Sequence, residues 1–242
     1  MGAGENVGSR LRRRLLVAGG VVVALLLALA GASALLAGSH RAPPPLGLNS
    51  PAAGDASLSG VDGPWAVATS QVGYRVKEQF INQPGPTEAV ARTSKVTGGL
   101  LIVGSGASLK ATRIHVSVDL ASLQSQDTYA SYQTYQRDFF IRSIYLKTDR
   151  YPNAEFDADS AAIPVGAESG PTALVASGRL TVHGVTKPVT AHLQVQLGGS
   201  NVMVAGSITV DMRDFGIEVP AISFTTAEPT VVIEFQLALV HS

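Results

Sequence analysis

The chain has 242 residues and no cysteine, with 18 Lys or Arg balanced by 18 Asp or Glu. The lack of cysteine excludes a disulfide framework and a lipid-modified cysteine, and it argues against a structural zinc site. From residue 43 onward 13 basic residues stand against 17 acidic ones, a net charge of −4. A mildly acidic domain without a basic stripe is a poor match for nucleic acid.

The first element is an uncharged apolar run, residues 15–38, preceded by an arginine-rich segment, residues 1–14. A helix of this length spans roughly 30 Å of hydrocarbon. Since positive charge stays on the cytoplasmic side, we expect residues 1–14 in the cytoplasm and 15–38 as a single-pass transmembrane signal anchor in the cell membrane. The rest of the chain is then extracytoplasmic. The alternative is a cleaved signal peptide, with residues 15–30 as its apolar region and residues 32–34 (Ala-Ser-Ala) as its cleavage site.

Residues 39–63 are rich in Pro, Gly, Ala and Ser and have no hydrophobic period. Such a composition is typical of a disordered or extended linker. We expect this linker to tether one domain, residues 64–242, which is long enough for a sizeable core and short for two domains.

Alternation of apolar and polar residues dominates that domain, and it predicts strands with one dry face and one wet face. The predicted strands are residues 65–78, 96–103, 114–120, 155–159, 174–182, 189–197, 203–210 and 233–239. Turn signals at 183–184 and 198–201 predict hairpins, with a positive φ at Gly184. Eight strands joined by turns indicate an all-β antiparallel barrel or a sandwich.

One helical stretch, Asp127–Tyr145, interrupts the strands. Its tyrosines and phenylalanines recur at steps of three and four, which places them along one helix face. Residues 129–156 hold eight of the 14 aromatic residues of the chain. We expect this helix either to complete the core at one end of the barrel or to cover a ligand cavity.

Three charged residues of this stretch, Arg137, Asp138 and Arg142, are candidates for structure or recognition. The spacing of Asp138 and Arg142 predicts an ion pair along the helix. The other interpretation places an arginine at the mouth of a cavity, where its guanidinium group is suited to a phosphate or pyrophosphate.

No arrangement in the sequence is typical of catalysis or metal binding. The five histidines have no metal-ligand spacing, and neither a nucleophile elbow nor a phosphate-binding glycine loop occurs. We therefore expect a protein that is not an enzyme, with no catalytic residue, cofactor or metal ion.

Several sequence words occur in the order found in one known family. They are Trp65, Gly73–Val76, Glu78–Phe80, Val96–Gly98, Val118–Leu123, Arg137–Asp138, Tyr151–Phe156, Gly178–Val189 and Asp214–Ile217. Over residues 64–240 the chain resembles the YceI-like family.

The resemblance implies a lipocalin-like antiparallel barrel, because members have that fold and have been linked to polyisoprenoid lipids held in an elongated lumen. Together with the eight predicted strands, it implies an eight-stranded barrel with one short covering helix. We predict Arg137 and Arg142 as head-group residues of a bound lipid. The predicted lipid-binding residues of the lumen are Tyr74, Phe139, Phe140, Ile144, Tyr145, Phe156, Phe215 and Phe224.

Two features depart from the family pattern. The first strand reads Ala68, Thr69 and Ser70 where many members carry Asp and His, which puts a head-group contact from that strand in doubt. The segment Asp127–Gln136 is longer than the usual link and carries three tyrosines. The ligand of this chain therefore need not be that of other members.

The sequence thus predicts a membrane-tethered, extracytoplasmic binding protein for a polyisoprenoid or similar long-chain apolar lipid. A first alternative is a non-catalytic structural or interaction module of the cell envelope with a packed lumen. A second is an enzyme acting on a bound lipid, which needs a buried acid or base that the sequence does not identify.

Overall fold

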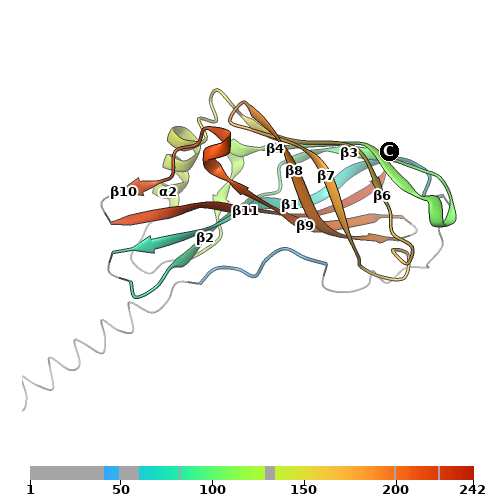
Figure 1. Cartoon of the computed structure of the whole chain (residues 1–242), viewed down its shortest axis with the longest axis horizontal. Helices are drawn as coiled ribbons and strands as arrows, with labels where there is room; N and C mark the ends of the chain where they lie inside the picture. The colour runs from blue at the N-terminus through green and yellow to red at the C-terminus, as the bar shows by residue number, and fades with distance from the viewer. Residues whose placement is uncertain (1–40, 49–59, 82, 129–133, 199, 223) are drawn as a thin grey trace, which may run out of the picture. The chain divides into compact units, whose positions relative to one another are not determined.

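Eight long antiparallel strands close into a barrel in the computed structural model (Figure 1). The structure describes residues 41–48, 60–81, 83–128, 134–198, 200–222 and 224–242. The barrel strands are β1 (Gly63–Phe80), β3 (Val96–Val103), β4 (Lys110–Asp119), β6 (Asn153–Ala162), β7 (Thr172–Val182), β8 (Val185–Leu197), β9 (Val202–Asp211) and β11 (Thr225–His241). They follow the order β11-β9-β8-β7-β6-β4-β3-β1, and pairing of β1 with β11 closes the ring. The predicted eight-stranded antiparallel barrel is confirmed.

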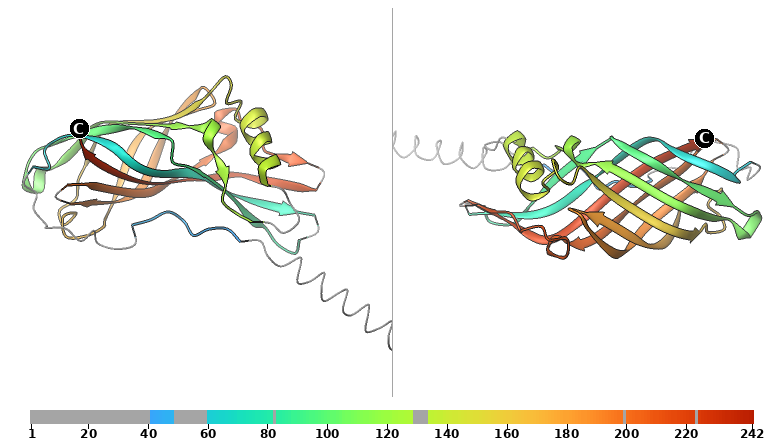
Figure 2. Two further views of the ribbon diagram at one scale, coloured as in Figure 1. Left: turned by 180° about the vertical axis from the view of Figure 1, so that it is seen from behind. Right: turned by 90° about the horizontal axis from the view of Figure 1, so that it is seen from above.

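Three further strands were not predicted: β2 (Thr87–Thr93), β5 (Gln124–Ser125) and β10 (Ala221–Ile222). The second half of β1 pairs with β2, because β3 pairs only with the first four residues of β1. β5 then pairs with β2, and β10 pairs with β11. These additions lie at the barrel end that carries the helix α2, as Figures 1 and 2 both show.

The helical segment is shorter than predicted. It comprises α2 (Thr134–Phe140), continued by a π-helical turn, η3 (Ile141–Tyr145). Asp127 lies outside it, and residues 129–133 are outside the described part of the chain. Single 3₁₀ turns occur at η1 (Gly106–Ser108), η2 (Leu120–Ser122) and η4 (Met212–Phe215).

The opposite end of the barrel is closed by a hydrophobic core. Trp65 is 1% exposed there, and its indole Nε1 donates to the Val61 carbonyl at 2.9 Å. Ile102, Leu197 and Leu239 belong to the same cluster. This end of the barrel, where β1 begins, therefore has a solid floor.

The hairpin between β7 and β8 has the predicted turn. His183 and Gly184 have φ values of +54° and +76°, as a two-residue turn matched to the strand twist requires. The His183 ring packs edge-on against Tyr151, with 4.7 Å between ring centroids. The positive φ predicted for Gly184 is confirmed.

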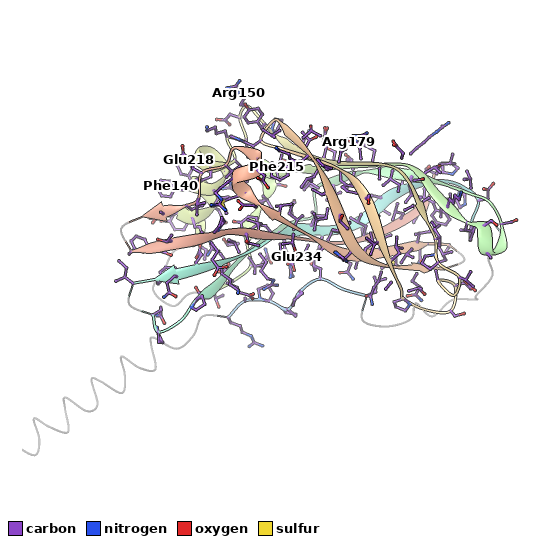
Figure 3. The ribbon with its side chains drawn as sticks, viewed as in Figure 1. Phe140, Arg150, Arg179, Phe215, Glu218 and Glu234 are labelled. Atoms are coloured by element: carbon purple, nitrogen blue, oxygen red, sulfur yellow. The ribbon has the colours of Figure 1, made fainter. Side chains whose placement is uncertain are left out.

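Residues Arg41–Leu48, here called the strap, run along the outside of the barrel (Figures 1 and 3). Composition predicted a disordered or extended linker there; the strap is extended, but it is also hydrogen-bonded to the barrel. Its Pro43 and Pro44 carbonyls accept from Arg75 and Arg92 at 2.8 and 2.6 Å. Its Leu46 N–H donates to a carboxylate of β11 at 3.3 Å.

That carboxylate belongs to Glu234, which is 2% exposed although it lies on the outer wall (Figure 3). Glu234 pairs with Arg92 at 2.7 Å and Arg75 at 3.5 Å, and Arg75 also pairs with Glu88 at 2.7 Å. We call these four residues the outer cluster. The strap thus lies over an ion-pair network and bonds to three of its members.

No helix among the described residues is long and apolar enough to cross a membrane. The predicted anchor, residues 15–38, lies outside those residues and stays a prediction.

Candidate functional site

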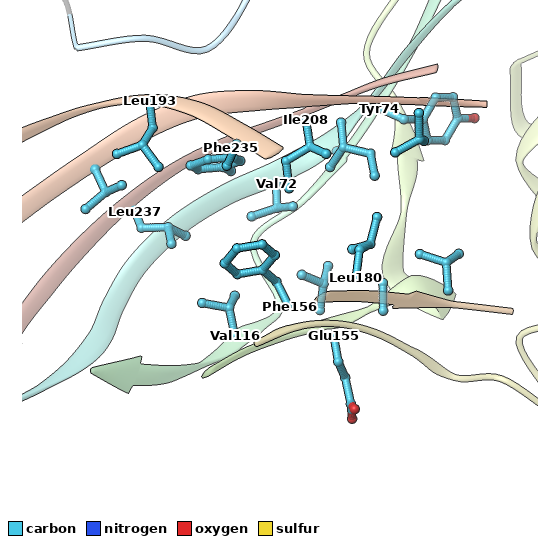
Figure 4. Close-up of a pocket in the computed structure, with 18 of the residues that line it drawn as sticks. Val72, Tyr74, Val116, Glu155, Phe156, Leu180, Leu193, Ile208, Phe235 and Leu237 are labelled. Carbon is cyan, nitrogen blue, oxygen red and sulfur yellow. The ribbon is translucent and has the colours of Figure 1, made fainter. Parts of the chain in front are cut away.

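The interior of the barrel holds an apolar cavity of about 280 Å³, here called the lumen. Side chains from all eight barrel strands line it, and Figure 4 shows Val72, Val116, Phe156, Leu180, Leu193, Ile208, Phe235 and Leu237 converging on it. An eight-stranded barrel is just wide enough for its own side chains to fill. Space remains here because several lining positions are alanines: Ala111, Ala154, Ala161, Ala162, Ala176 and Ala191.

The lumen runs from the floor to the covering helix. At the floor its lining includes Ile102 and Leu239, and at the other end it includes Ile141 and Tyr145 of η3. The few polar lining residues are Tyr74, Glu78, Tyr145 and Glu155. Figure 4 shows the Glu155 side chain pointing away from the cavity. Polarity is therefore concentrated in Tyr74 and Glu78 of β1 and in Tyr145, toward the helix end.

A buried ion-pair group holds α2 in place beside that polar end. Arg137 donates through Nη1 to Asp127 Oδ2 at 3.0 Å, through Nη2 to Asp127 Oδ1, and through Nη2 to Ser125 Oγ at 2.6 Å. Glu78 Oε2 lies 3.6 Å from Arg137 Nη1. The next residue of α2, Asp138, accepts from the Ser125 N–H at 3.0 Å. Two adjacent helix residues thus fix α2 to β5 and its neighbours.

Burial shifts the pKa values of the ionisable groups at the polar end. It raises the pKa of the Glu78 carboxyl group, and the nearby Arg137 offsets only part of this effect. Burial also raises the pKa of the Tyr74 phenol well above its ordinary value. For Arg137 burial by itself lowers the pKa, but the hydrogen bond to Asp127 and the surrounding negative charges outweigh it and raise the pKa overall. Tyr74 is thus neutral and Arg137 charged at all physiological pH values.

The Tyr74 hydroxyl has no hydrogen-bond partner among the described residues, although it lies at the polar end of an otherwise apolar lumen. A phenol can both donate and accept a hydrogen bond. A buried polar group normally has a partner, because leaving it without one costs free energy. Tyr74 can therefore bond to a polar atom of a ligand in the lumen.

The predicted site residues fall into two sets. Tyr74, Tyr145, Phe156 and Phe215 line the lumen, whereas Phe139, Phe140, Ile144 and Phe224 are 42–58% exposed and are not among its lining residues. Their role in lipid binding stays a prediction.

Helix geometry explains this division. Arg137, Ile141 and Tyr145 follow one another at steps of four and share the inward face. Phe140 and Ile144 lie one position earlier, on the adjacent face, and are exposed.

Both predicted head-group arginines have protein partners. Arg137 is paired with Asp127, and Arg142 donates through Nη1 to the Leu123 carbonyl at 2.9 Å. The predicted pair of Asp138 and Arg142 does not occur among the described ion pairs, because each residue bonds to another partner.

Sequence reasoning missed Glu78 as a site residue. The signal was present, because Val72, Tyr74, Val76, Glu78 and Phe80 occupy the same face of β1. A carboxylate in that inward register stands out among apolar neighbours.

A family model described as the YceI-like domain matches residues 65–239. The chain is 30% identical over 132 residues to a UPF0312 protein of Pseudomonas putida, which is 52% of this chain and 62% of that one. It is 30% identical over 120 residues to a UPF0312 protein of Vibrio cholerae serotype O1, covering 47% of this chain and 57% of that one. The chain thus spans about three-fifths of the length of these curated relatives.

Among solved structures, the chain is similar to a polyisoprenoid binding domain from Saccharophagus degradans implicated in plant cell wall breakdown. The TM-score is 0.50 at 17% identity, and the match covers 74% of this chain and 98% of that one. At this identity the likeness concerns the fold. The family match, in contrast, runs through all eight barrel strands, and the chain therefore belongs to the YceI-like domain family.

Proposed function

We propose that this protein binds a polyisoprenoid or similar long-chain apolar lipid in the barrel lumen. The observation that carries the proposal is the apolar cavity, which is lined from every barrel strand and ends at a small polar group. Each Å² of apolar ligand surface removed from water there contributes on the order of 25 cal/mol. The structural similarity to a polyisoprenoid binding domain supports the same ligand class.

The ligand lies with its tail toward the floor and its polar end near Tyr74 and Glu78. Arg137 is charge-paired with Asp127, with Glu78 close by, which leaves little positive charge for a phosphate. A neutral hydroxyl or carbonyl group suits the free Tyr74 hydroxyl and a carboxyl group of raised pKa better.

The protein performs this function as a membrane-tethered, extracytoplasmic domain. The support is the sequence of residues 1–38, in which four arginines precede an uncharged apolar run. The alternative of a packed barrel loses support from the cavity. The alternative of an enzyme would depend on Glu78, the buried carboxyl group of raised pKa that lines the lumen.

The test is lipid extraction and native mass spectrometry of the full chain purified from its host membranes. The lumen-filling variant is Ala191→Phe, since Ala191 lines the lumen opposite Ala176 on the next strand. The matched control is Thr190→Phe, one position away on the exposed face of β8. We expect a long-chain lipid with the parent chain and the control, and its loss from Ala191→Phe without a lower melting temperature. Equal lipid content in both variants contradicts lumen binding.

A further inference from the structure

Large exposed apolar side chains gather at the helix end of the barrel. In the described part of the chain every exposed aromatic residue lies there, on α2 or at the tip of β11, together with two exposed isoleucines. We call this set the aromatic rim: Ile81, Tyr135, Phe139, Phe140, Ile144 and Phe224. The other large exposed apolar residues are four valines elsewhere, at positions 103, 165, 175 and 240.

The aromatic rim adjoins the polar end of the lumen. Phe140 and Ile144 precede Ile141 and Tyr145, both of which line the cavity. Phe224 lies at the tip of β11, which contributes Ala227 to the same lining, and its ring stacks on Phe80 with centroids 6.4 Å apart. Figure 3 shows Phe140 and Glu218 at this end. The rim therefore lies at the end of the barrel that holds the polar part of the lumen, with members beside both α2 and β11.

We propose that the aromatic rim docks on a lipid bilayer, with its side chains at the boundary of head groups and acyl chains. Contiguous exposed apolar patches mark interaction sites, and aromatic residues favour the membrane interface. A long-chain lipid that passes from a bilayer directly into the lumen does not expose its tail to water. The choice of partner rests on the proposed function, whereas docking itself requires no lipid in the lumen.

The position of the strap supports a bilayer rather than another partner. The backbone N–H and C=O of Arg41 pair with those of Thr128 at 3.2 and 3.1 Å, and Thr128 follows Asp127, the partner of Arg137 in α2. The strap therefore enters the barrel at the end that carries the aromatic rim. The apolar run 15–38 ends three positions before Arg41, a link that spans at most about 10 Å. The run that the sequence predicts as a membrane anchor therefore joins the barrel through the strap at the rim end.

Charge does not drive this docking. Exposed groups of both signs flank the rim: Lys147 and Arg150 follow η3, while Glu218 and Glu228 lie on either side of β10. Such a mixed surface gives no net attraction to anionic lipids. The proposal therefore expects docking to phosphatidylcholine, which carries no net charge, driven by burial of apolar area.

The absence of cysteine allows a direct test with single labels on the full chain. Phe140→Cys places an environment-sensitive fluorophore on the rim, and Val165→Cys places it on a more exposed apolar position, between Ile163 and Ala167 of the floor cluster. Both proteins are reconstituted in phosphatidylcholine vesicles that carry a quencher on the acyl chains. We expect blue-shifted emission and several-fold stronger quenching at position 140 than at position 165. Equal quenching at the two positions overturns the proposal.

A second variant separates docking from ligand binding. Ile81→Ser with Tyr135→Ser, two rim residues without a predicted role in the lumen, should lose most quenching of the label at Phe140→Cys, while the lipid extracted from the protein stays unchanged. Quenching of a protein with an empty lumen supports docking and contradicts the proposed function. Lipid in the lumen without quenching contradicts docking alone. Cross-linking of Phe140→Cys between two copies, with no quenching, shows a protein interface and also overturns the proposal.

Discussion

At the scale of single residues, Glu78 has two properties that matter for the site. It lies on the inward face of β1, and the nearby Arg137 offsets only part of the effect of burial on its pKa. Its carboxylate is 3.6 Å from an arginine that already binds Asp127. Glu78 is therefore better suited to share a proton or hydrogen bond with a ligand than to stabilise the fold.

The pKa of Glu78 predicts how stability depends on pH. Burial raises it above its ordinary value of 4.5, so the folded chain holds this proton more tightly than the unfolded chain. The stability that this proton contributes is present below 4.5 and is lost as pH rises through the folded pKa. We expect Glu78→Gln to remove this loss, so that the variant gains free energy of unfolding relative to the parent as pH rises.

Urea unfolding of delipidated protein across that pH range measures the effect. Glu228→Gln is the control, since Glu228 is exposed on β11. Parallel curves for the parent chain and Glu78→Gln contradict the assignment.

At the scale of elements, the alternation of apolar and polar residues predicted the barrel strands but not β2. The eight barrel strands were found because each has one wet and one dry face. β2 was missed because Ala89, Val90 and Ala91 are all buried, at 1%, 0% and 1% exposure. Both of its faces are covered, and the Val90 N–H donates to Asp127 Oδ1 at 3.0 Å, so the sequence shows no alternation.

The helical segment was recognised from its aromatics, but its inward face was not. Sequence reasoning assigned the aromatic face to the interior, whereas Arg137 is the buried residue of α2. A charged residue faces inward because Asp127 and Ser125 satisfy it. This pairing joins residues ten and twelve positions apart and leaves no periodic trace in the sequence.

The strap is the element that composition could not place. A Pro-rich segment is extended whether it is free or bound. Its docking depends on the outer cluster, whose arginines have guanidinium groups directed at the two proline carbonyls.

Removal of Glu234 should therefore release the strap. In Glu234→Ala the Leu46 N–H loses its acceptor, Arg92 loses its carboxylate, and Arg75 keeps Glu88 as its one carboxylate partner among the described residues. We expect a loss of about 3 kcal/mol in stability and faster hydrogen exchange at Leu46. Glu228→Ala, an exposed change on the same strand, should do neither. Unchanged exchange at Leu46 would show that the strap is held by other contacts.

At the scale of the whole molecule, the barrel and the covering helix give the lumen two unlike ends. Trp65 and its neighbours close the floor, while Tyr74, Glu78 and α2 form the polar end. The eight predicted strands implied a closed wall, but they did not show whether the interior is filled. That depends on the combined volume of side chains from every strand, which alternation of apolar and polar residues does not report.

A lumen with one solid end should select its ligand by length. A tail that enters from the helix end stops at the floor, so a bulkier floor admits only a shorter tail. Ala111 lines the lumen beside the floor and is 7% exposed, and we expect Ala111→Phe to shift the extracted lipids toward shorter chains while binding persists. Ser160→Phe, on the exposed side of β6, is the control, and mass spectrometry of the extracts gives the chain lengths. If Ala111→Phe leaves that distribution unchanged while its melting temperature matches that of the parent, the tail does not reach the floor, and the orientation proposed for the ligand is wrong.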